Sequence, residues 1–131
     1  MKNHPVIGIR PIVDSRRLGI RDSLEGKVAE MAEKAKKLIE ENVFYADGTP
    51  ARVIIFSEGS IAGGEEAARC QAEFTANGVT ATLSVTPSWC YPLETIDIDP
   101  MTTKAIWGFN GTENPGAVYL AAAMAAHAQK G

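Results

Sequence analysis

Cysteine is scarce in this sequence, with Cys70 and Cys90 the two cysteines among 131 residues. Two cysteines cannot build the disulfide framework of a small secreted domain, and their spacing matches no paired metal motif. An apolar run of about 18 residues, the length that crosses a bilayer, is also missing, and the first residues lack the apolar core of a signal peptide. We therefore expect a cytoplasmic protein without a membrane span.

A strong excess of charge is missing as well. The 13 basic and 16 acidic residues give a net charge of −3, which supplies no strong positive field for a phosphate backbone. We therefore do not expect nucleic acid as a partner. Hydrophobic residues make up 45% of the chain and charged residues 22%, as in ordinary globular proteins. The length suits one domain, which we expect to span residues 1–131.

Predicted strands alternate with predicted helices along the chain. Apolar runs predict strands at 6–9, 53–56 and 104–109, while alternating apolar and hydroxyl residues at 79–85 predict a strand that is half-buried or near a sheet edge. Helices are expected up to about Asn42, with Asp22 or Ser23 as the cap and Glu25 in the first turn, and at 65–76 and 116–130. This alternation predicts an α/β fold with a doubly wound, mostly parallel sheet of the Rossmann or flavodoxin-like type. Because the sequence ends after a helix, we interpret it as truncated before a further strand.

Ligands of open parallel sheets gather at the carboxyl ends of the strands. The segments expected there are 14–21, 57–64, 86–95 and 110–114. Arg16 offers several donors, which suits a sugar or a carboxylate, although a solvated loop with an Asp–Arg pair is an equally simple interpretation. Trp89 can stack on the C–H face of a sugar, although a tryptophan can also serve the core or an interface.

Other polar groups give weaker indications of chemistry. We expect structural or solvated roles for six of them, namely His4, Cys90, Glu94, Asp97, Asp99 and His127, because none belongs to a convergent set of metal ligands or catalytic groups. Gly59, Gly63 and Gly64 lie between a strand and a helix, but their pattern is neither a Walker A motif nor a dinucleotide fingerprint. We therefore predict no catalytic and no metal-binding residue in this chain.

Four blocks carry a more specific signal. They are IGIRP at 7–11, the run from Arg16 to Glu25, VTPSWCYPLETIDIDP at 85–100 and KAIWGFNGTENPGAVYLAAAMAAHAQKG at 104–131. Together these blocks resemble the opening domain of L-fucose isomerases, and the similarity runs from about Val6 to the last residue. The chain departs from the family pattern at two places, because Ser88 stands where we expect a cysteine and Pro92 where we expect a glycine.

The resemblance implies an aldose–ketose isomerase that interconverts L-fucose and L-fuculose, with D-arabinose as a related substrate. In that family a divalent metal, typically Mn²⁺, acts as a Lewis acid, and the metal ligands and catalytic carboxylates lie in later domains. The resemblance therefore implies that this chain is the sugar-recognising N-terminal part of a longer enzyme and is inactive alone. The family forms hexamers in which this domain helps to close a neighbouring subunit's pocket. By the same resemblance, Trp89 stacks on the sugar and Arg16 hydrogen-bonds its hydroxyls.

Two interpretations from other functional classes stay open at this point. The fold and the glycines at 59–64 also suit a stand-alone flavodoxin-like module that binds a phosphorylated ligand or a nucleotide. A purely structural domain at an oligomer interface, in which Trp89 contacts protein and no sugar, is the third possibility.

Overall fold

The computed structural model describes residues 4–16, 19–90, 99–109 and 116–130, which form a four-stranded parallel sheet with helices on both faces. The elements are β1 (Val6–Pro11), α1 (Ile20–Asn42), β2 (Arg52–Ile55), α2 (Gly64–Ala76), β3 (Val79–Thr86), β4 (Thr103–Gly108) and α4 (Gly116–Lys130). The strand order is β2-β1-β3-β4. The predicted doubly wound α/β fold is therefore confirmed. Across these ranges, the helices are too short or too polar to traverse a bilayer.

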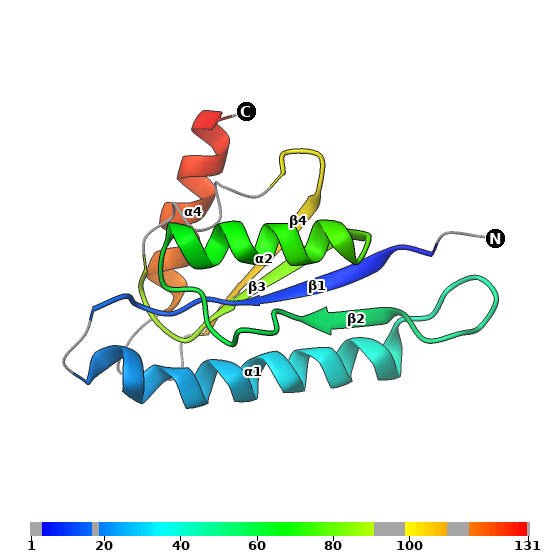
Figure 1. Ribbon diagram of the computed structural model, residues 1–131, viewed down its shortest axis with the longest axis horizontal. Coiled ribbons are helices and arrows are strands. Elements are labelled where there is room, and N and C mark those ends of the chain that lie inside the picture. Colours follow the sequence, from blue (N-terminus) through cyan, green and yellow to red (C-terminus); the bar gives the residue numbers. More distant parts are fainter. Residues whose placement is uncertain (1–3, 17–18, 91–98, 110–115, 131) are drawn as a thin grey trace.

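Two apolar cores hold the helices to the sheet, one on each face. On one face α1 packs below β1, β2 and β3 in the view of Figure 1, and buried Ile9 and Leu24 lie in this core. On the other face α2 and α4 lie above the sheet, and their core contains Ile12, Phe74 and Ala123. Each core removes apolar surface from water, which is the main favourable contribution to folding.

Gly8 lets α2 approach the central strand closely. β1 pairs with both β2 and β3, and Gly8 lies opposite Ile54 on one side and Thr82 on the other. A Cβ atom at Gly8 would lie 2.4 Å from Cε2 of Phe74, so the aromatic ring occupies the space of a side chain. The contact requires the absence of a side chain at this position.

The sequence predicted that β3 is half-buried or close to a sheet edge, and the structure places it next to the edge strand β4, with burial increasing towards its carboxyl end. β3 lies between β1 and β4, and its hydroxyl side chains Thr82, Ser84 and Thr86 are buried. They face the side of the sheet on which Arg10 of β1 is also buried, and Arg10 donates from Nη1 to Oγ of Ser84 at 3.2 Å. The alternation of apolar and hydroxyl residues therefore reflects a polar interior and does not reflect exposure to solvent.

The start of α1 differs from the prediction. The helix begins at Ile20 after Gly19, whose φ of 88° is readily adopted by glycine alone, and neither Asp22 nor Ser23 is its cap. Ser23 lies inside the helix and donates from Oγ to the carbonyl of Ile20 at 2.8 Å. The sequence prediction failed because it looked for a capping side chain. The helix instead begins after Gly19, which has a positive φ and lies three residues before Asp22.

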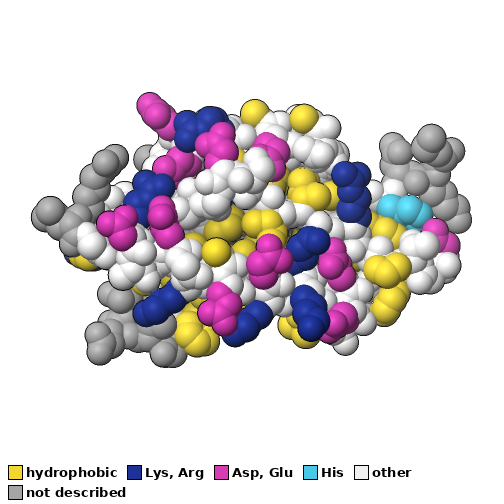
Figure 2. All heavy atoms as spheres, turned by 60° about the horizontal axis from the view of Figure 1, so that its bottom comes forward, with side chains coloured by type: hydrophobic (Ala, Val, Ile, Leu, Met, Phe, Trp, Pro, Cys, Tyr) yellow, Lys and Arg dark blue, Asp and Glu magenta, His cyan; other side chains and the backbone are white. Residues whose placement is uncertain are grey.

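The outer surface of α1 is a mixture of both charges. Basic and acidic side chains are interspersed on this side of the molecule in Figure 2. Three pairs spaced four residues apart connect Glu30 with Lys34, Lys36 with Glu40 and Lys37 with Glu41. Such exposed pairs contribute little each, so the helix is held chiefly by its buried face.

β4 is covered less completely than its neighbours. On the α1 side, Trp107 keeps 39% of its surface exposed and Leu38 of α1 keeps 64%. Between them lies an apolar groove of about 290 Å³, here called the β4 groove. It is lined by Lys34, Ala35, Leu38, Ile39, Leu83 and Trp107. α1 covers β2, β1 and β3 but leaves this side of β4 open.

Replacing Gly8 with alanine should destabilise the fold by about 1 to 3 kcal/mol, because the new methyl group would displace the buried Phe74 ring. Gly26→Ala is the matched control, since Gly26 lies in α1 with open space around it and alanine favours helix by about 1 kcal/mol. Urea unfolding of both variants measures the two changes. Equal stability of Gly8→Ala and the parent would contradict the close packing of α2 on β1.

Candidate functional site

The carboxyl ends of β1, β2 and β3 are continued by segments that lie side by side. Pro11 of β1 lies opposite Val85 of β3, and the next residue, Ile12, donates its N–H to the carbonyl of Val85 at 2.8 Å. Val13 donates to the carbonyl of Ile61, in the segment after β2, at 3.0 Å. Arg16 and Trp89 follow β1 and β3 within a few residues, so the structure brings both predicted residues to the same edge of the sheet.

A buried carboxylate fixes Arg16. Asp14 is 2% exposed and accepts hydrogen bonds from the backbone N–H of Arg16 at 2.9 Å and from its Nε at 2.9 and 3.0 Å. These side-chain bonds hold the pKa of the Asp14 carboxyl below its ordinary value, although burial acts in the opposite direction. The side chain of Arg16 remains 60% exposed. The Asp–Arg pair is therefore present, and it orients a guanidinium at the surface.

A second cluster of polar side chains is centred on Arg21. The backbone N–H of Arg21 donates to the carbonyl of Arg16 at 3.2 Å. The guanidinium of Arg21 bonds Glu25 of α1 at 2.8 Å and Glu66 of α2 at 2.9 Å, and Ser60 donates to Glu25 at 3.0 Å. The cluster thus connects the starts of two helices on opposite faces of the sheet. Sequence reasoning missed it, although the four-residue spacing of Arg21 and Glu25 was a usable signal.

Hydroxyl and backbone contacts hold the segment that carries Trp89. The buried Thr86 hydroxyl donates to the carbonyl of Ser88 at 2.8 Å. The carbonyl of Thr86 accepts the N–H of Phe109, just after β4, at 3.0 Å. Trp89 itself is half-buried. The residues just before Trp89 are therefore held near the ends of β3 and β4, and Trp89 keeps part of its surface accessible.

Ser88 is an unusual neighbour for Trp89. It is 1% exposed, and its hydroxyl has no hydrogen-bond partner among the residues that the structure describes. Leaving a buried hydroxyl unpaired costs free energy that a thiol or a methyl group would not cost to the same extent. This is also the position where the sequence resemblance led us to expect a cysteine.

Both cysteines are buried. Cys90 is buried, and its sulfur lies 3.8 Å from Oγ1 of Thr86. Cys70 is also buried, and burial raises the pKa of its thiol to about 11 despite the opposing influence of nearby Arg10. The thiolate form, which is the reactive one, is therefore disfavoured at Cys70.

The remaining candidate groups are dispersed over the molecule. His4 pairs with Asp47 at 3.0 Å, and Asp99 accepts the N–H of Met101 at 2.8 Å. His127 lies far along α4, beside a surface cavity next to β4. Gly59 has a φ of 96°, as a tight turn requires. Glu94, Asp97 and the segment 110–114 lie outside the described residues.

A metal ion would need several convergent ligands. Within residues 4–16, 19–90, 99–109 and 116–130, no three His, Cys, Asp or Glu side chains gather closely enough to hold one. The donor set of this part of the chain therefore does not fit a divalent metal, and we derive no reaction step through a metal here.

Asp14→Asn should lower the free energy of unfolding by about 1 kcal/mol at neutral pH, because the amide cannot replace a carboxylate opposite Arg16. A carboxyl whose pKa is lowered by folding stabilises the fold above its ordinary pKa of about 3.9 and loses that contribution as the pH falls through the folded value. Urea unfolding should therefore show parent and variant converging below about pH 4. Glu30→Gln, which removes an exposed pair, should change little, and an undiminished gap at low pH would contradict the assignment.

Ser88→Cys should stabilise the protein by about 1 kcal/mol, since the unpaired hydroxyl is replaced by a less strongly hydrated thiol. Thermal unfolding in the presence of a reductant measures the change. Ser57→Ala provides the contrast, because the Ser57 hydroxyl donates to Glu73 at 2.6 Å and its removal should not stabilise. A lower melting temperature for Ser88→Cys would show that the hydroxyl has a partner.

Comparison with known proteins gives a consistent result over the whole chain. The family model of the first N-terminal domain of L-fucose isomerase matches residues 4–131. An L-fucose isomerase from Clostridium perfringens is 60% identical over 131 residues, which is 100% of this chain and 22% of that protein. L-fucose isomerases from Salmonella schwarzengrund and Salmonella typhimurium are each 54% identical over 127 residues, or 97% of this chain and 21% of theirs.

The chain therefore spans about a fifth of the length of these relatives. Its match to the domain model is nearly complete and its identity to the relatives is high. The chain belongs to the L-fucose isomerase family, as a member of its first N-terminal domain.

Proposed function

We propose that this chain forms part of the sugar-binding rim of a cytoplasmic L-fucose isomerase that interconverts L-fucose and L-fuculose, with D-arabinose as a related substrate. Membership of the family supports the reaction. The observation that carries the role of this part is the placement of Arg16, fixed by buried Asp14, and of Trp89 at one edge of the sheet.

The two side chains suit complementary surfaces of a sugar. A guanidinium donates hydrogen bonds to hydroxyl oxygens, and an indole ring packs on the apolar C–H face of a pyranose or an open-chain sugar. Asp14 holds Arg16 in one orientation before any ligand arrives. Binding then costs less side-chain entropy than it would with an unrestrained arginine.

The proton transfer between neighbouring carbons belongs, in this proposal, to other parts of the longer enzyme. The family's Mn²⁺ and its ligands are assigned to those parts as well, since the described residues of this chain do not fit a metal. We propose that the domain works in a hexamer, in which it helps to close the pocket of a neighbouring subunit. The isolated chain is then inactive.

Trp89→Ala, made in a full-length isomerase that contains this chain, should lower kcat/KM for L-fucose about 10- to 100-fold, because the stacking surface is lost. Trp107→Ala is the matched control, since it removes a tryptophan that lies on β4 beside the β4 groove. Steady-state isomerisation with added Mn²⁺ measures both. Unchanged kcat/KM in Trp89→Ala, or turnover by the 131-residue chain alone, would overturn the proposal.

A purely structural interface role is a second candidate, and the β4 groove favours it. Leu38, Trp107 and Phe109 are large apolar side chains that remain 64%, 39% and 37% exposed. The same two tryptophan variants distinguish the roles. An interface role predicts altered sedimentation of Trp107→Ala with normal kcat/KM, whereas sugar recognition predicts the kinetic loss in Trp89→Ala with normal assembly.

A further inference from the structure

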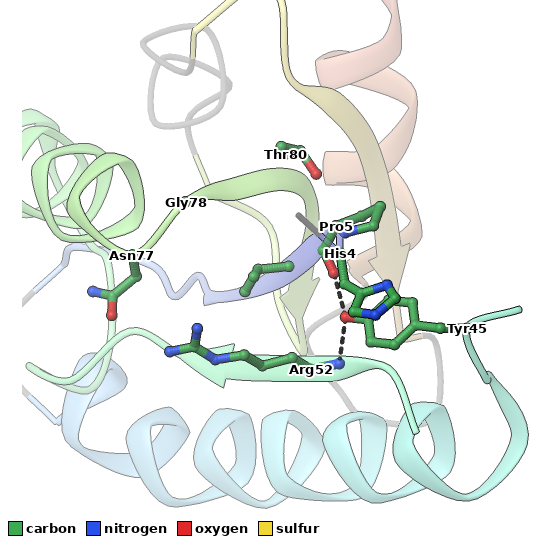
Figure 3. Close-up of a pocket in the computed structure, with 8 residues that line it drawn as sticks. His4, Pro5, Tyr45, Arg52, Asn77, Gly78 and Thr80 are labelled. Carbon is green, nitrogen blue, oxygen red and sulfur yellow. Dashed lines mark hydrogen bonds between the residues drawn. The ribbon is translucent and has the colours of Figure 1, made fainter. Parts of the chain in front are cut away.

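A cavity of about 650 Å³ lies at the amino ends of the strands, at the edge opposite Arg16 and Trp89. It is lined by His4, Pro5, Val6, Tyr45, Arg52, Asn77, Gly78 and Thr80. These residues come from the starts of β1, β2 and β3, from the turn before β2 and from the end of α2. In Figure 3 the polar groups of Arg52 and Asn77 lie at one end of the cavity, and the rings of His4 and Tyr45 lie at the other. We call it the amino-edge cavity.

Several contacts hold the aromatic end of the cavity. The hydroxyl of Tyr45 donates to the carbonyl of Pro5 and accepts the backbone N–H of Arg52, as the dashed lines in Figure 3 mark. The ring of His4 stacks on that of Tyr45 with 4.1 Å between centroids, and its Nε2 lies 3.0 Å from Asp47. Three segments thus hold one aromatic wall in place before any ligand binds.

Arg52 differs from the other arginines that the structure describes. Arg10, Arg16, Arg21 and Arg69 each bond a side-chain hydroxyl or carboxylate of the chain. The guanidinium of Arg52 has no such partner within the described ranges, and the side chain extends along the cavity in Figure 3. A guanidinium with its donors directed to an open cavity is suited to a planar or tetrahedral oxyanion.

Two further groups complete the polar end. The side-chain nitrogen of Asn77 donates to the carbonyl of Glu73 at 2.8 Å, which fixes the amide beside the cavity. The N–H groups of Asn77 and Gly78 cap carbonyls at the end of α2, which reduces the negative potential that a helix end would otherwise present. Thr80 is exposed on the third side and offers a hydroxyl donor.

We propose that the amino-edge cavity binds a small organic anion, with its carboxylate or phosphate on Arg52 and its apolar or ring-shaped body over Val6 towards Tyr45. The cavity has a cationic end at Arg52 and an aromatic end at Tyr45. It therefore matches a ligand with an anionic group at one end and an apolar body at the other. This site is distinct from the Arg16 and Trp89 edge and does not depend on the sugar-binding proposal.

Titration of the ¹⁵N-labelled 131-residue chain with phenyl phosphate, benzoate and inorganic phosphate tests the site by amide chemical-shift changes. We expect saturable shifts at Arg52, Gly78 and Thr80, with phenyl phosphate or benzoate binding several-fold more tightly than inorganic phosphate, because the ring adds contact with the apolar wall. The order of phenyl phosphate and benzoate distinguishes a phosphate ligand from a carboxylate ligand.

Arg52→Gln should weaken the tighter of these ligands about tenfold, since the charge-assisted hydrogen bonds are lost. Arg69→Gln is the matched control, because it removes an exposed arginine whose guanidinium is already paired with Glu58 at 2.7 Å. The amide spectrum of each variant reports whether it is folded. Tyr45→Phe, which keeps the ring but removes the two bonds of its hydroxyl, should weaken binding less than Arg52→Gln.

Three results would overturn the proposal. The first is a folded Arg52→Gln chain that binds as tightly as the parent, and the second is equal weakening by Arg69→Gln, which would indicate general charge attraction. The third is the absence of saturable shifts at the amino edge with all three probes. In this third case, shifts confined to the Arg16 loop would place anion binding at the other edge.

Discussion

The pairing of β1 with strands on both of its sides is the constraint on which the rest of the structure depends. β1 aligns β2 through Gly8 and Ile54 and aligns β3 through Gly8 and Thr82. Phe74 lies on the bare backbone at the same residue, so α2 takes its place from the same strand. This alignment also positions the segments that precede and follow the three strands, at both edges of the sheet. A shift of β1 by one residue against its neighbours would disrupt the groupings of side chains at both edges at once.

Much of the fold could be predicted from the sequence because the relevant signals are local. Apolar runs, an alternating pattern at 79–85 and helix signals indicated the strands and helices, and the alternation of strands with helices indicated parallel pairing. The differences arose where a contact between distant residues decides, or where the signal lies in the backbone and no side chain carries it. Buried Ser84 accepts a hydrogen bond from Arg10, 74 positions away, and no local pattern reports that contact. The start of α1 depends on the backbone of Gly19, which a search for capping side chains overlooks.

The two edges of the sheet differ in how far their chemistry could be anticipated. Asp14 and Arg16 are two residues apart, so an ion pair between them was an obvious possibility, and the structure contains it. The link from Arg21 to Glu66 spans 45 positions, and the amino-edge cavity combines residues from 4 to 80. Such assemblies exist only after the sheet has formed. The sugar-binding roles of Arg16 and Trp89 remain predictions of the family resemblance and of their shared position.

The surroundings of the two tryptophans have a practical consequence for spectroscopy. Trp89 lies half-buried where β3 ends, whereas Trp107 lies on β4 with its ring 6.1 Å from that of Phe109 in an edge-on arrangement. Removing either one leaves a protein with a single indole emitter. The fluorescence of each such protein reports on one region alone, so its emission wavelength and its quenching by iodide separate events at the carboxyl end of β3 from events beside the β4 groove.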